Sequence, residues 1–194
     1  MPKKNPIPVE LDELLAAEFN YIAQTAAQAH EDRARVSSFY LVAVGSLLAG
    51  LFSTQLFDAG HLTVTVKLMF SGLFTLLTLL GTSTVMQLAR LRAAWYESML
   101  AMNKIKDFAM NQNPELVDAF LWKTNTLPNK FKTNSVSFYQ AIQVAMIGGL
   151  MFGAAVFFFQ QAFFEISLLT WVVSILSGVV AVYLQLAMYR MVLN

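Results

Sequence analysis

The amino-acid sequence predicts an all-α, polytopic membrane protein with four transmembrane helices. Apolar residues make up 57% of the 194 residues and charged residues only 13%, and the mean hydropathy is +0.55. Soluble domains carry about twice that charged share, roughly a quarter of their residues. Four apolar stretches are long enough to cross the core of a bilayer, which needs about 20 residues. The charged residues lie almost entirely outside these stretches, because unpaired charge is unstable in lipid.

Residues 1–35 form the first of four segments, and we expect an N-terminal amphipathic helix outside the membrane. The acidic residues Asp12 and Glu13 suit the positive end of a helix dipole. An apolar stripe follows at three- and four-residue spacing, at Leu11, Leu15, Phe19, Ile22 and Ala26. This stripe can pack on another helix of the chain, on a neighbouring subunit or on the membrane surface. No helix breaker follows, so one continuous helix is expected from about residue 9 to 57.

Two transmembrane hairpins account for the four apolar stretches. The first hairpin occupies residues 36–88 and the second occupies residues 135–194. The four spans are expected over 36–57, 63–87, 136–159 and 166–189. Only a short turn joins the two spans of each hairpin, so both hairpins enter the membrane from the same side.

The segment 89–134 between the hairpins continues the helical pattern of the second span outside the membrane. Its apolar stripe includes Leu91, Trp95, Met102 and Ile105, with charged residues between them. We expect Asn113 and Pro114 either to end this helix or to restart it, and the short segment Glu115–Trp122 follows. The aromatic residues at its end are typical of an anchor at the membrane interface.

The distribution of basic residues predicts the orientation of the chain. Of the 13 lysines and arginines, all except Lys67 precede the first span, lie between the hairpins or follow the fourth span. Segments rich in lysine and arginine stay on the cytoplasmic side. We therefore expect an inner-membrane protein whose N-terminus, C-terminus and 89–134 segment are all cytoplasmic.

The two hairpins share a sequence pattern that indicates an internal repeat. Val36-Ser37-Ser38-Phe39-Tyr40 begins the first hairpin, and Ser135-Val136-Ser137-Phe138-Tyr139 begins the second, with an offset of 99 residues. Gln87 and Gln185 near the ends of the hairpins have an offset of 98. Chance is the alternative, because membrane helices draw on few residue types. A true repeat predicts two parallel hairpins that pack face to face around an axis along the membrane normal.

Small residues four positions apart predict close helix contacts in the membrane. In lipid such pairs let two helix backbones approach one another. The pairs are Gly45 with Ala49, Ser46 with Gly50, Gly149 with Gly153, and Ser174 with Gly178. These contacts can form within one bundle or between subunits of an oligomer.

The sequence contains no pattern of residues that predicts catalysis, a metal site or a cofactor. Cysteine is absent, only two histidines occur, and the nucleophile, phosphate-loop and His–Glu metal motifs are missing. The net charge of +1 gives no reason to expect nucleic-acid binding. We therefore expect a protein that is not an enzyme and has no cofactor.

Polar side chains in and beside the spans are the remaining candidates for function. The glutamines Gln87, Gln140, Gln143 and Gln185 can line a gated pore in an oligomer or bond across helices inside a closed bundle. At the membrane boundary lie the arginines Arg33, Arg35, Arg90 and Arg92. We expect the neighbouring acids Glu31 and Asp32 to pair with Arg33, Arg35 or the basic middle segment.

One further feature is the order of these elements along the chain. An amphipathic helix, the basic pair Arg33 and Arg35, the sequence Phe39-Tyr40-Leu41, a two-span hairpin and a helical extension from Arg90 follow one another. This layout resembles the SLATT-type two-span modules of prokaryotic conflict systems, and it is similar to that of small octameric cytoplasmic-membrane proteins. The resemblance implies a pore-forming effector triggered by a nucleotide-sensing partner. This chain departs from the pattern by having four spans and no fused sensor domain.

Three functional hypotheses follow. The first is a non-enzymatic homo-oligomer of the inner membrane with a cytosolic helical collar and a regulated pore. The second is a structural or accessory subunit of a larger membrane complex, whose aromatic surface meets a protein partner. This surface comprises Phe157, Phe158, Phe159, Phe163, Phe164 and Trp171. The third is a protein that binds a lipid or quinone in a groove between the hairpins.

Overall fold

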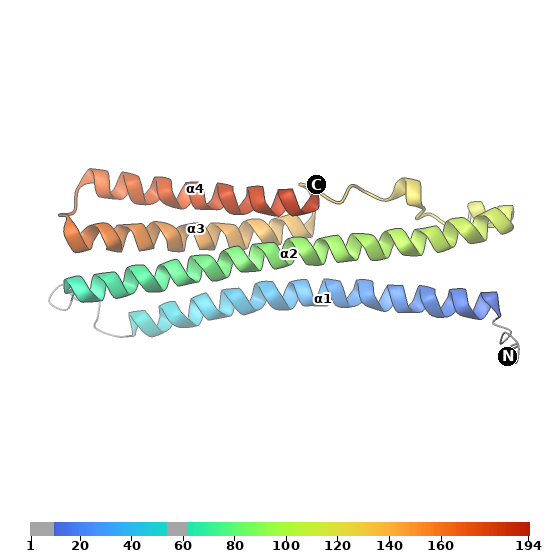
Figure 1. The fold of residues 1–194 in the computed structure, drawn as a ribbon, viewed down its shortest axis with the longest axis horizontal. Helices are drawn as coiled ribbons and strands as arrows, with labels where there is room; N and C mark the ends of the chain where they lie inside the picture. The colour runs from blue at the N-terminus through green and yellow to red at the C-terminus, as the bar shows by residue number, and fades with distance from the viewer. Residues whose placement is uncertain (1–9, 54–61) are drawn as a thin grey trace, which may run out of the picture.

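The computed structural model describes residues 10–53 and 62–194, and its long elements are all helices. In chain order these are α1 (Leu11–Phe52), α2 (Val64–Gln112), α3 (Val136–Phe163) and α4 (Leu168–Leu193) (Figure 1). Two short 3₁₀ helices, η2 (Pro114–Val117) and η3 (Thr124–Thr126), lie between α2 and α3. Each of the four long helices is long and apolar enough to cross a membrane. This confirms the predicted all-α fold with four membrane-spanning helices.

Helices α1 and α2 are much longer than a bilayer requires. Their 42 and 49 residues correspond to about 63 Å and 74 Å, against a hydrocarbon core of roughly 30 Å. Both continue past the ends of α3 and α4 and lie side by side beyond them (Figure 1). We call this part, residues 11–35 of α1 and 89–112 of α2, the extension. The prediction that both helices continue beyond their spans is thereby confirmed.

The helix boundaries differ from the predicted ones in three places. Helix α1 ends at Phe52 and not at residue 57, while the turn predicted at 58–61 lies outside the described residues. Helix α3 runs to Phe163, past the predicted 159, and α4 covers 168–193 where 166–189 was predicted. Hydroxyl caps determine three of the helix starts, because Thr63, Ser135 and Ser167 accept hydrogen bonds from backbone N–H groups three residues later.

Of the two predicted alternatives at Asn113 and Pro114, the structure shows that the helix ends, because α2 stops at Gln112. After α2 ends, only Pro114–Val117 forms one 3₁₀ turn, and Asn113 makes no side-chain cap to it. Leu121 and Trp122 are 81% and 59% exposed. Without a cap or a covered apolar face, this segment has little to hold a longer helix together.

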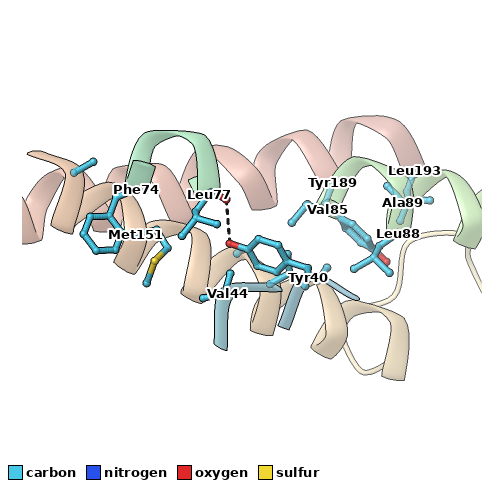
Figure 2. Packing of buried hydrophobic residues seen from close by; sticks show 14 of the residues in the cluster. Tyr40, Val44, Phe74, Leu77, Val85, Leu88, Ala89, Met151, Tyr189 and Leu193 are labelled. Carbon is cyan, nitrogen blue, oxygen red and sulfur yellow. Dashed lines mark hydrogen bonds between the residues drawn. The ribbon is translucent and has the colours of Figure 1, made fainter. Parts of the chain in front are cut away.

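Helix α2 is the centre of the bundle. It packs against α1, α3 and α4, whereas α1 packs mainly on α2 and touches α3 at few positions. The main core contains Tyr40, Phe74, Leu88 and Tyr189 (Figure 2). Tyr40 donates a hydrogen bond from its hydroxyl to the Leu77 carbonyl oxygen at 3.3 Å. One helix is therefore in contact with every other membrane-spanning helix.

The extension has a small core of its own. Ile22 and Ala26 of α1 pack with Met102 of α2, and partly buried Phe19 and Ile105 surround them. The two apolar stripes predicted from the sequence thus meet within one chain, together with partly buried Leu15, Leu91 and Trp95. The start of the α1 stripe is not covered, because Leu11 is 56% exposed.

The two predicted copies of the repeat occupy different environments. Tyr40 is 2% exposed, whereas its counterpart Tyr139 is 55% exposed. Phe39 is 76% exposed, whereas its counterpart Phe138 is partly buried against the core. The face that α1 buries is therefore the face that α3 exposes, and the two hairpins do not pack as symmetric copies.

Candidate functional site

Four buried polar side chains, one from each long helix, meet near the end of the bundle where the extension begins. They are Arg33 of α1, Arg92 of α2, Ser137 of α3 and Tyr189 of α4, and we call them the boundary cluster. Each side chain is between 1% and 7% exposed. Arginine is almost never fully buried in proteins unless it is paired. Two buried arginines in one place therefore need a physical explanation.

The hydrogen bonds of the two arginines use only part of their donor capacity. Arg33 donates from Nη1 to the Ser137 Oγ and from Nη2 to the His30 Nδ1, the latter at 2.6 Å. The Arg33 Nε is buried and has no partner among the described residues. Arg92 donates from Nε to the Lys130 carbonyl oxygen at 3.3 Å, and its guanidinium lies 4.3 Å from the centre of the Trp95 ring.

Neither buried arginine has a carboxylate partner in the described parts of the chain. The one ion pair there joins Arg35 to Asp32 at 3.6 Å. Of the predicted pairings for Glu31 and Asp32, only this one forms. Burial lowers the pKa of the Arg33 guanidinium, and the positive charge of Arg92 lowers it further. Burial also lowers the pKa of Arg92. The cluster is an uncompensated pair of positive charges.

The four predicted boundary arginines divide into two buried and two exposed. The Arg35 side chain is 79% exposed, and Arg90 is also exposed. Residues two apart on a helix point about 200° away from one another. Arg33 and Arg35 therefore face opposite sides of α1, and Arg90 and Arg92 face opposite sides of α2.

The small residues of α3 and α4 form a close contact within the chain. A Cβ at Gly178 would lie 2.8 Å from the Gly149 carbonyl oxygen, and one at Gly153 would lie 3.0 Å from the Ser174 carbonyl oxygen. A Cβ at Gly149 would overlap Val182. The pairs on α3 and α4 thus serve packing inside one bundle, which was one of the two predicted alternatives.

The small residues of α1 do not contact any other described helix. Gly45, Ser46, Ala49 and Gly50 are all exposed. A Cβ built at Gly45 or at Gly50 has no atom of another described helix within 4 Å. We call these four residues the α1 small face. It lies opposite Tyr40 and Val44, the residues through which α1 packs on α2.

The four candidate glutamines do not gather in one place. Gln185 is 3% exposed, and neither its Oε1 nor its Nε2 has a hydrogen-bond partner in the described structure. Gln140 is partly buried with its Oε1 unpaired, while Gln87 and Gln143 are exposed. The four amides therefore do not all face the interior of the described bundle.

Two grooves open on the surface of the membrane-spanning part. The larger, about 430 Å³, lies between α3 and α4 over Gly149, Gly153 and Gly178, with Trp171 at its wall. It is bounded by the helices of one hairpin, and not by the two hairpins as predicted. The smaller, about 340 Å³, lies between α1 and α2 and is lined by Arg35 and Gln87.

The predicted aromatic surface is partly internal. Phe158 is stacked on Phe74 with ring centres 5.7 Å apart and packs against Phe70 at 5.2 Å. Phe157 contacts Trp171 with ring centres 4.5 Å apart. The more exposed members are Phe159, Phe163, Phe164 and Trp171. Phe158 therefore belongs to the core and not to a lipid-facing surface.

The fold and these sites define a polytopic α-helical membrane protein without an identifiable catalytic constellation in its described residues. No group of three or more metal-ligating side chains occurs within 10–53 and 62–194. Comparisons with protein-family models, curated proteins and solved structures found no match.

Sequence reasoning missed two members of the boundary cluster. Ser137 stood out only as part of the repeated Ser-Phe-Tyr pattern, and Tyr189 only as the end of a span. The sequence of α4 does contain a pattern that indicates this site, because Gln185 and Tyr189 are four residues apart and share one face of the helix. Polar residues repeated on one face of an apolar helix indicate a buried contact there.

Proposed function

We propose that the protein is a non-enzymatic inner-membrane protein that assembles into homo-oligomers through the α1 small face. The observation that supports this proposal is that the small face of α1 is open, whereas the small residues of α3 and α4 are tightly packed. Small residues give close contact between helices in lipid, where association depends on packing because lipid offers no hydrophobic gain.

The repeat strengthens this inference. With the offset of 99 residues, the four members of the α1 small face correspond to Val144, Ala145, Gly148 and Gly149 of α3. All four of these α3 residues are buried inside the bundle. The α1 small face thus has the residue sizes of a packed helix surface but has no partner among residues 10–53 and 62–194.

We propose a second copy of this chain as the partner, with the extension contributing a cytosolic collar. Apolar side chains of the extension remain open to solvent, including Leu14 at 53%, Tyr21 at 66% and Phe108 at 42%. Exposed apolar side chains that follow one another along a long helix favour self-association. Contacts along both halves of α1 would then hold the same two chains together.

The activity that we propose for this assembly is a regulated pore. Gln87 and Gln143 are exposed within the spans of a single chain. An amide that faces lipid loses its hydrogen bonds to water, so such side chains usually face another helix or a water-filled path. Gln87 lines the groove between α1 and α2, and we propose that this amide faces a water-filled path in the assembly.

Native mass in a mild detergent tests the assembly, by light scattering or native mass spectrometry. We expect a discrete ring of identical chains for the natural protein and a monomer for the double variant Gly45→Leu, Gly50→Leu. The matched control is Gly72→Leu, because Gly72 is also exposed with no atom within 4 Å of a built Cβ. A monomeric natural protein, or equal loss of assembly in the control, contradicts the proposal.

Conductance and topology complete the test. If the ring forms, recordings across planar bilayers should show channels that the double variant lacks. A reporter enzyme active only in the periplasm, fused after Asn194, should stay inactive if the C-terminus is cytoplasmic. Activity of that reporter contradicts the proposed orientation.

A second candidate function is that of an accessory membrane subunit that holds a lipid or quinone. The groove between α3 and α4 favours it, because its wall combines three glycines with Trp171 and is open along one side. Extraction and mass spectrometry of molecules that copurify with the protein would reveal such a ligand. Val179→Trp, at an exposed residue of the groove wall, should remove it from the groove, whereas Gly72→Leu should not.

A further inference from the structure

We propose that the boundary cluster is a binding site for an oxyanion of the phosphate class, held between the guanidinium groups of Arg33 and Arg92. The proposal concerns a ligand site and does not depend on the oligomeric state. It rests on the burial of both arginines, on the missing carboxylate and on the free donors that remain.

The first argument is the balance of charge. Arg33 is 4% and Arg92 is 7% exposed, and both are anchored at the start of α3: Arg33 donates to the Ser137 Oγ and Arg92 to the Lys130 carbonyl oxygen just before that helix. Burial of two like charges is unfavourable, because the low dielectric of the interior strengthens their repulsion and removes their hydration. An arginine does not become neutral by losing its proton at ordinary pH, so the charge remains when the side chain is buried. A bound anion would offset the repulsion between the two charges and would replace their lost hydration with hydrogen bonds.

The second argument is the supply of hydrogen-bond donors. The Arg33 Nε–H is buried and unpartnered in the described structure, so it is available to an acceptor in the cluster. Arg92 uses Nε for the Lys130 carbonyl, which leaves its two Nη groups as donors. A tetrahedral oxyanion with several oxygens fits such donors, because arginine forks bind phosphate oxygens in pairs.

The third argument is the position of the cluster in the fold. Ser137 is in the first turn of α3, and Tyr189 is in the last turns of α4. The cluster therefore lies where both shorter helices end, at the level of lipid headgroups in the predicted topology. The headgroup phosphate of an anionic lipid and a soluble phosphate can both reach this level. The chemistry of the ligand is the same in either case.

Thermal unfolding of the full-length protein tests the proposal, with intrinsic tryptophan fluorescence as the readout. The protein is kept in a neutral detergent and chloride buffer. One arm adds dioctanoyl phosphatidylglycerol, with dioctanoyl phosphatidylcholine as the uncharged comparison. The other arm adds sodium phosphate, with sodium chloride at equal ionic strength as the comparison. At about 100 times the dissociation constant, a bound ligand should raise Tm by roughly 5–10 °C.

The chain supplies closely matched control variants. Arg33→Gln and Arg92→Gln should lose most of the rise in Tm, while Arg35→Gln and Arg90→Gln should keep it, because Arg35 and Arg90 are exposed. Without ligand, Arg33→Gln and Arg92→Gln should unfold no earlier than the natural protein, since each removes one of two repelling charges. If Arg33→Gln fails to fold, Arg92→Lys still tests the site, because it keeps the charge but loses the planar donor fork.

Each outcome has a definite meaning. A rise with phosphatidylglycerol alone assigns the site to a lipid headgroup, and a rise with sodium phosphate assigns it to soluble phosphate. Both support the oxyanion site if the two buried arginines are required. No rise with either ligand, or equal losses in Arg35→Gln and Arg90→Gln, overturns the proposal.

Discussion

The contact between α3 and α4 should not tolerate a side chain at Gly178. A Cβ there would lie 2.8 Å from the Gly149 carbonyl oxygen and 3.6 Å from the Gly153 Cα. Ordinary contacts begin at 3.4 Å, so even one added carbon forces the backbones about 0.6 Å apart. Valine adds two more carbons at the same point. Overpacking of this kind destabilises a protein by about 1–3 kcal/mol.

The same substitution at Gly72 isolates this packing effect. Both glycines lie inside long helices, so the gain of a few tenths of a kcal/mol from replacing glycine by valine is common to both. No atom lies within 4 Å of a Cβ at Gly72. We therefore expect Gly178→Val to unfold roughly 2–12 °C below Gly72→Val.

The assay is thermal unfolding followed by circular dichroism, with both variants in the same detergent at one low protein concentration. Gly153→Val provides an independent check, because its Cβ would lie 3.0 Å from the Ser174 carbonyl oxygen. Equal melting temperatures for Gly178→Val and Gly72→Val would refute the assigned contact between α3 and α4. The fold would then need a different explanation for these glycines.

Three further predictions concern polar and apolar burial. Gln185→Met should stabilise the protein by about 1–3 kcal/mol in the same assay, because Gln185 has two buried polar atoms without partners; a loss of stability would indicate a hydrogen bond not present in the structure. Tyr40→Phe should lower stability by about 0.5–1.5 kcal/mol through loss of its hydrogen bond to a backbone carbonyl, whereas Tyr139→Phe, its exposed counterpart, should change stability by less than about 0.5 kcal/mol. Met102→Asp should reduce the helical circular dichroism of the extension, because Met102 is buried between α1 and α2, while Phe108→Asp at an exposed position should leave it unchanged.

The burial of Met102 inside the extension also determines which substitutions can test assembly. Replacing Met102 and Ile105 by aspartate would not isolate contacts between subunits. Both residues pack on α1 of the same chain, so these substitutions would disturb the extension itself. Gly45 and Gly50 are better positions, because a Cβ at either one meets no other helix in the described part of the chain.

The membrane-spanning helices and the extension could be predicted from the sequence because periodic apolar patterns are local signals. The stripes that contain Ile22 and Met102 follow helical spacing, and the structure brings them together. Helix ends were less predictable. Phe52 ends α1 without a glycine or proline next to it, and hydroxyl caps at Ser135 and Ser167 act over three residues only.

The boundary cluster could not be predicted, because it depends on which face of each helix turns inward. Arg33 and Arg35 look equivalent in the sequence, yet one is buried and the other is exposed. The repeated pattern predicts equivalent environments for its two copies, and the structure differs because the sequence pattern does not determine which face of a helix is buried. Tyr40 and Tyr139 match in sequence, but their helices have different neighbours and are turned differently in the bundle.

Helix α2 is continuous from the membrane-spanning part to the end of the extension. Its 49 residues contain no proline, and it touches α1, α3 and α4 along the way. A helix of this kind transmits rotation and tilt because its hydrogen-bonded turns do not yield independently. A displacement of α2 in the extension would therefore change the contacts of α2 with α1, α3 and α4.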